Sequence, residues 1–165
     1  MPSPIQLQIL DEIDSRLKGI NTTNGYFSDM HIGDVHRAKM TPFKGDDLPA
    51  INYWSGETRT EDKGHGFSYM AFDIEIEMHT KTNDRPFTDV TSELSADIII
   101  ALYRDDALPK VSDQPSYKLG DMVDGLNVDA ISPQLGEGQS PYCGVLVSLS
   151  ITYRVKAHDP FTIIS

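Results

Sequence analysis

The sequence predicts an α+β fold, in which a mostly antiparallel sheet of two hairpins carries two amphipathic helices packed on one face. Residues 67–81 alternate apolar and polar side chains, most plainly in the run FDIEIEM at 72–78. Residues 143–156 alternate in the same way, and a period of two is typical of a strand with one buried and one exposed face. Two further segments, 5–17 and 87–102, space their apolar residues as helices do.

The chain begins with an amphipathic helix. Ser3 and Pro4 can start it, because proline fits the first turn of a helix. The apolar residues that follow at helical spacing are Ile5, Ile9, Leu10, Ile13 and Leu17. Gly19 then ends the helix. A turn-rich stretch follows at 21–25, and the mixed pattern of residues 26–40 predicts a strand.

A first hairpin is predicted between residues 48 and 81. The segment LPAINYW at 48–54 is typical of an extended strand, and the alternating segment 67–81 is its partner. The charged residues 57–66 lie between the two. We therefore expect the hairpin to have a long, exposed connection.

A second helix and a second hairpin complete the predicted fold. Residues 82–86 supply cap and first-turn chemistry, and one helical face then carries Phe87, Val90, Leu94, Ile98 and Leu102. Residues 105–124 hold two prolines and no clear period, which predicts an irregular insertion. Segments 125–135 and 142–155 form the second hairpin across a glycine-rich loop, and an extended C-terminal tail follows at 157–165.

The composition fits a single domain over residues 1–165 and limits the classes of partner that this domain is expected to bind. A net charge of −11 disfavours binding to phosphate backbones, which requires clustered Lys and Arg, so its partners are expected to be proteins. Cys143 is the only cysteine, and an intrachain disulfide is therefore impossible. No segment has the apolar run of a signal peptide or a membrane span. This predicts a protein that is made in the cytoplasm and does not associate with a membrane.

The search for catalytic or metal-binding residues yields no site. On a strand, His31 and His36 point to opposite faces and cannot share a metal. Glu75, Glu77 and His79 lie on one face at two-residue spacing, but any amphipathic strand shows this spacing on its wet face. The sequence also contains no P-loop and no nucleophile elbow. We therefore expect no enzymatic activity and no metal or cofactor.

The order of the predicted elements is helix, weak strand, hairpin, helix and hairpin. Within this order stand the opening helix ILDEI at 9–13, LPAINYWSGE at 48–57, FDIEIEM at 72–78, the helix around Leu94, and VSLSITY at 147–153. In the order and spacing of these segments the chain resembles the tail terminator family of tailed bacteriophages, the group of the lambda minor tail protein U. The segment 110–120 and the residues beyond Lys156 depart from the family's compact pattern.

The resemblance implies a structural virion protein without enzymatic activity. Such a protein forms a hexameric ring on the finished tail tube, stops its polymerisation and presents a surface to a neck or head-completion protein. It is assembled in the host cytoplasm and resides at the head-proximal end of the virion tail, where DNA passes without specific binding. Two alternatives remain: another tail or neck component, such as a tube subunit or a head-tail joining protein, and a small-molecule-binding domain.

Candidate interface residues lie in two charged segments. A charged, exposed connection between strands can become ordered when it meets the tail tube, although a solvated turn without a partner shows the same pattern. Two acids after the second helix stand where the helix dipole is negative, and this mismatch indicates an interface. The candidates are Glu57, Arg59, Glu61, Asp62 and Lys63 in the connection, and Asp105 and Asp106 after the helix.

Overall fold

The structure, a computed structural model, describes residues 2–104, 119, 122–135 and 141–164, with the backbone alone at 62–64. Helix α1 (Ile5–Lys18) begins after Pro4 and ends at Gly19, whose N–H bonds to the Arg16 carbonyl oxygen. Its buried residues recur every fourth position and are Ile5, Ile9, Ile13 and Leu17. The prediction of an amphipathic first helix is therefore confirmed.

The segment after α1 is mostly irregular. It contains three short 3-10 helices (Thr22–Asn24, Ile32–Asp34 and Gly45–Asp47) and one strand, β1 (Val35–Arg37). The strand predicted over residues 26–40 is therefore only three residues long. At the start of this segment, the backbone N–H groups of Phe27 and Ser28 bond to the Asp97 carboxylate rather than to a neighbouring strand.

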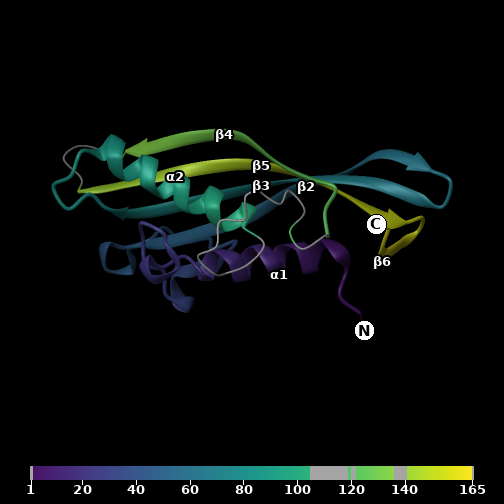
Figure 1. Ribbon diagram of the computed structural model, residues 1–165, viewed down its shortest axis with the longest axis horizontal. Helices are drawn as coiled ribbons and strands as arrows, with labels where there is room; N and C mark the ends of the chain where they lie inside the picture. Colours follow the sequence, from purple (N-terminus) through teal and green to yellow (C-terminus); the bar gives the residue numbers. More distant parts are fainter. Residues whose placement is uncertain (1, 105–118, 120–121, 136–140, 165) are drawn as a thin grey trace.

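Strands β2 (Ala50–Gly64) and β3 (Phe67–Lys81) form an antiparallel hairpin that differs from the prediction. The expected long connection at 57–66 is wrong, because β2 continues through most of it. Pairing runs to Gly64 and Phe67, which leaves His65 and Gly66 as the turn, and Gly66 has a φ of +86°. The threonines at 58 and 60 favour an extended backbone, and two bulges adjust the register. The far end of the hairpin extends well beyond the helices (Figure 1).

The second half of the chain contains helix α2 (Phe87–Tyr103) and the antiparallel strands β4 (Gly125–Leu135) and β5 (Tyr142–Lys156). The predicted second helix is confirmed. The C-terminal tail predicted at 157–165 instead turns back at His158, where φ is +61°, and forms β6 (Asp159–Ile163) against β5. Most of the insertion predicted at 105–124 lies outside the described residues.

The strands form one six-stranded sheet in the order β1-β2-β3-β5-β4, with β6 also paired to β5. The α+β class is therefore confirmed. The sheet is larger than two hairpins, because β3 pairs along its whole length with β5, and β1 and β6 are added. Only the β1–β2 pairing is parallel.

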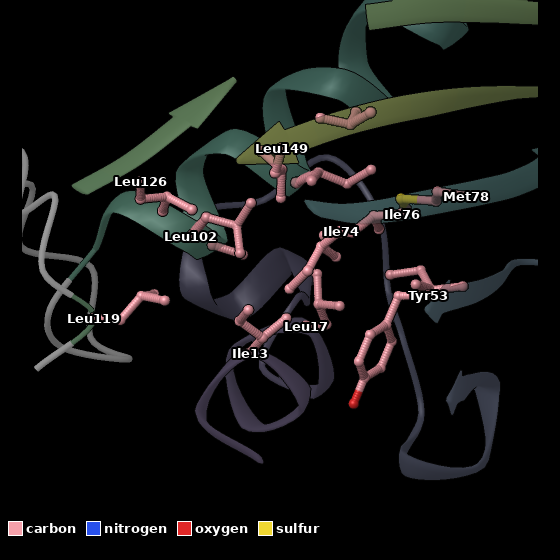
Figure 2. Packing of buried hydrophobic residues seen from close by; sticks show 14 of the residues in the cluster. Ile13, Leu17, Tyr53, Ile74, Ile76, Met78, Leu102, Leu119, Leu126 and Leu149 are labelled. Carbon is pink, nitrogen blue, oxygen red and sulfur yellow. The ribbon is translucent and has the colours of Figure 1, made fainter. Parts of the chain in front are cut away.

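A single hydrophobic cluster joins the sheet to the helices. Alternate residues of β3 and β5 enter it, together with the buried faces of α1 and α2 (Figure 2). Leu119, although it lies in the predicted insertion, is fully buried in the same cluster. The other residues of β3 and β5 point to the opposite side of the sheet, which we call the open face.

Candidate assembly surface

The open face carries a row of acidic side chains on β3: Asp73, Glu75 and Glu77. They alternate with the buried residues of the same strand and are partly exposed. The row arises because acidic residues occupy alternate positions of a strand whose other positions face the core. Negative charge is therefore concentrated along the middle of the sheet.

Each acid in this row has a polar neighbour on an adjacent strand. The Ser148 hydroxyl donates to Glu75 at 2.7 Å, and the Asn52 amide donates to Glu77 at 3.1 Å. The Asp73 carboxylate accepts two hydrogen bonds from Arg59. Hydrogen bonds across strands hold these side chains in defined positions on the open face.

Arg59 and Glu61 are the predicted interface residues for which the structure records ion pairs among those it describes. The Arg59 guanidinium bonds to Asp73 at 2.8 and 3.0 Å and also lies 3.5 Å from Glu61. The hydrogen bonds from Arg59 lower the pKa of Asp73, and the same pairing raises the pKa of Arg59. The residue predicted for a mobile loop is thus part of an ordered cross-strand pair.

The remaining candidate interface residues are distributed differently from the prediction. Glu57 and Glu61 are exposed on β2, inside a strand and not in a connecting loop. Asp62 and Lys63 belong to the same strand, where only their backbone is described. Asp105 and Asp106 lie outside the described residues.

Two edges of the sheet are open to a further strand within the described part of the chain. On one side, β1 pairs only with residues 51–53 of β2, so the outer edge of β2 from Trp54 to Gly64 has no strand beside it. On the other side, β4 is the last strand and pairs only with β5. An unpaired edge presents backbone N–H and C=O groups to a neighbouring chain.

The β4 edge is bordered by an exposed apolar strip, which consists of Ile131, Pro133 and Leu135. These residues pair with Val147, Val145 and Cys143, all buried, and so they face the same side of the sheet as the core. Ile131 is nevertheless 43% exposed and Leu135 63% exposed. Apolar side chains on the core side of a sheet but open to solvent mark a possible contact surface.

The strip was not predicted, although the sequence contains a signal for it. Ile131-Ser132-Pro133-Gln134-Leu135 alternates apolar and polar residues, as a strand does. A proline inside such a pattern is typical of an edge strand, because it has no N–H to donate to a neighbouring strand. The alternating pattern does not reveal how much of β4 the helices cover, and this coverage decides whether the strip is exposed.

A separate pocket of about 460 Å³ lies at the end of the sheet away from the β2–β3 turn. Phe43 and Tyr142 line it with His79, and the Phe43 and His79 rings are 6.0 Å apart. Gly144 lets His79 lie against the sheet, since a Cβ at 144 would stand 2.5 Å from its Nδ1 atom. Of the predicted interface residues whose side chains are described, Glu57, Arg59 and Glu61, none lines this pocket.

The described residues contain no group of three or more His, Cys, Asp or Glu side chains placed to hold a metal ion. None of the helices in the described part of the chain is both long and apolar enough to cross a lipid bilayer. No protein-family model matches the sequence, and no curated protein matches it.

Proposed function

We propose that this protein is a bacteriophage tail terminator, a structural virion protein without enzymatic activity. In this proposal, six copies form a ring on the finished tail tube, stop tube polymerisation and form the interface to a neck or head-completion protein. The protein acts at the head-proximal end of the tail, after assembly in the host cytoplasm. It needs no cofactor and is not bound to a membrane.

The proposal takes its specific identity from the ordered segments that resemble the tail terminator family. The arrangement of elements supports it: α1, the short β1, the β2–β3 hairpin, α2 and the β4–β5 pair follow one another in the order on which the resemblance depends. The structure departs from the expected pattern mainly by adding β6 and by replacing the predicted loop with strand.

The observation that carries the proposal is the pair of open edges on β2 and β4. A ring is built from a heterologous contact, in which two different patches of each copy meet. A sheet with one open edge on each side provides two such patches. In a closed ring, each copy contacts one neighbour through the first patch and the other neighbour through the second, so both patches of every copy are occupied.

The charge of the open face fits a channel for DNA. If the sheet lines the channel and the two helices lie outside it, each copy contributes Asp73, Glu75 and Glu77 to the channel wall. Six copies of a chain with a net charge of −11 surround the DNA with negative charge. Such a wall repels phosphates, so the genome passes without being held.

The test is electron microscopy of tails assembled in cells with and without this chain. The proposal expects tubes that are overlong or lack a cap when the chain is absent, and tubes of normal length when it is supplied again from a plasmid. Normal, capped tubes in its absence would contradict tail termination. Missing tubes would indicate a tube subunit, and complete tails unattached to heads would indicate a head-tail joining protein.

A further inference from the structure

We infer that the open edge of β4 is the docking site for the outer edge of β2 from a second copy of this chain. The docking surface consists of the β4 backbone edge and the strip Ile131, Pro133 and Leu135. The occupant is the part of β2 beyond its pairing with β1, from Trp54 to Gly64. This inference rests on the proposed ring and identifies the contact that closes it.

The directions of the strands support a head-to-tail contact. In the sheet, β2 is antiparallel to β3, β3 to β5, and β5 to β4. Strands β2 and β4 therefore run in opposite directions. When a second copy is placed beside the first without being inverted, its β2 runs antiparallel to the first copy's β4, and the alternation continues across the contact.

The side chains on the two edges are compatible. Thr58 and Thr60 of β2 pair with Phe72 and Met70 of β3, so they lie on the core side of the sheet. In the docked pair they fall on the same side as Ile131 and its neighbours. Threonine packs well on a half-buried strand surface, and no described β2 side chain on this side would bring a charge against the apolar strip.

The charge of Arg59 on β2 falls on the other side of the docked pair. Arg59 pairs with Ala71 of β3 and bonds to Asp73, which places it on the open face. The β4 residues on that face include the uncharged Ser132 and Gln134 and also Asp129, whose carboxylate accepts a hydrogen bond from the Ser150 hydroxyl. Charge on the open face therefore does not select this contact, which depends on the backbone edges and on the apolar strip.

Pro133 limits the contact without preventing it. It has no N–H, so the added ladder has a gap at this residue. A proline on an edge strand also reduces unspecific pairing with other strands. Alternate residues of a strand direct their N–H groups to the same edge, so Ile131 and Leu135 retain donors on the edge that Pro133 faces. Specificity then depends on the apolar strip that borders the edge.

The positions of the two edges along the strands agree with a closed ring. Ala130, in the middle of β4, is level with Ser148, Glu75 and Trp54 on the neighbouring strands. The open part of β2 extends from Trp54 toward the β2–β3 turn. When the middle of this open part docks against β4 of the next copy, the two copies are shifted relative to each other along the strands. The strands are then tilted relative to the ring axis, as closure of a sheet into a ring requires.

The first test joins two singly substituted chains by cross-linking. Thr60→Cys and Ile131→Cys place one thiol on each edge, and the chain's own Cys143 is buried at 2% exposure. A bismaleimide with a flexible spacer is added to each variant alone and to their mixture, both as concentrated purified protein and as tails assembled in cells that make both variants. The inference expects a cross-linked dimer from the mixture only.

Two results of this test would overturn the inference. A dimer from Ile131→Cys alone would show that β4 pairs with itself around a two-fold axis. Absence of the mixed dimer in both preparations would place the contact elsewhere. Neither result concerns tail length, so a failed docking inference and a failed terminator proposal are distinguishable.

The second test compares two substitutions of apolar residues with similar exposure. Ile131→Lys puts a charge into the strip, whereas Leu7→Lys puts the same charge on α1, at a residue 40% exposed against 43% for Ile131. We expect Ile131→Lys to weaken association by about tenfold or more, because the ammonium group must be buried, and Leu7→Lys to leave it unchanged. Circular dichroism verifies that both variants fold, and equal association of the two would contradict the inference.

Discussion

Arg59 on β2 donates two hydrogen bonds to the Asp73 carboxylate on β3, at 2.8 and 3.0 Å. The two residues are diagonal neighbours, since Arg59 itself pairs with Ala71. Two parallel bonds between a guanidinium and a carboxylate fix the relative orientation of both groups. Arg59 lies in the segment expected to be an exposed loop, and its bonds to Asp73 help to hold this segment as a strand, which places the outer edge of β2 in a defined position.

The pair predicts a pH dependence that NMR titration of Asp73 can measure. We expect its pKa to lie below the ordinary 3.8, because Arg59 stabilises the carboxylate. A lowered pKa means that the pair contributes stability above the ordinary value and loses that contribution as the pH falls through the lowered value. In Arg59→Gln, the pKa of Asp73 should rise toward 3.8. Arg85→Gln removes a different pair, with Glu93, and should leave Asp73 unchanged.

Asp97 predicts a large effect on stability. Its carboxylate, fully buried on α2, accepts the N–H groups of Phe27 at 2.8 Å and Ser28 at 2.9 Å. Asp97→Ala leaves both donors without this acceptor, so we expect the free energy of unfolding to fall by about 2–4 kcal/mol in urea denaturation. Asp89→Ala, an exposed acid in the first turn of the same helix, should cost less than about 1 kcal/mol. Equal losses would show that the buried hydrogen bonds of Asp97 contribute no more to stability than the exposed carboxylate of Asp89.

Gly144 predicts a steric cost at the end of the sheet that lies away from the β2–β3 turn. A Cβ at this position would lie 2.8 Å from the Met78 carbonyl oxygen and 2.5 Å from His79 Nδ1. Gly144→Ala should therefore destabilise the protein by about 1–3 kcal/mol, because backbone must shift to relieve the contact. The matched control is Gly56→Ala, where the nearest atoms, in Asp73, are 3.7 Å away. An unchanged urea midpoint for Gly144→Ala would contradict this account of the His79 position.

Cys143 predicts slow thiol chemistry in the folded protein. It is 2% exposed, and burial raises the pKa of its thiol. A smaller thiolate fraction and a blocked approach both slow reaction with a disulfide reagent at pH 8. We expect fast labelling only after urea unfolding, while Ser132→Cys adds an exposed thiol that reacts at once. Rapid labelling of the unsubstituted native chain would show that the β4–β5 region opens readily.

Several elements followed from the sequence because their signals are local. The four-residue spacing of apolar residues in α1 and α2 and the alternation in β3 and β5 reflect the geometry of helix and strand, and each of these elements was correctly located. The acidic row on β3 followed from the same alternation. The second half of β2 and the strand β6 were not predicted. The charged residues of β2 and the short turn before β6 resemble a solvated loop.

The candidate site depended on contacts between distant parts of the chain. Strand β2 continues to Gly64 because β3 supplies its hydrogen-bond partners and Asp73 supplies a partner for Arg59, and neither is visible in the local pattern of residues 57–66. The exposure of Ile131 and Leu135 likewise depends on where the helices end over the sheet. Periodicity reveals which face of a strand is apolar, but only the folded chain decides which strands have an open edge and which apolar residues stay uncovered.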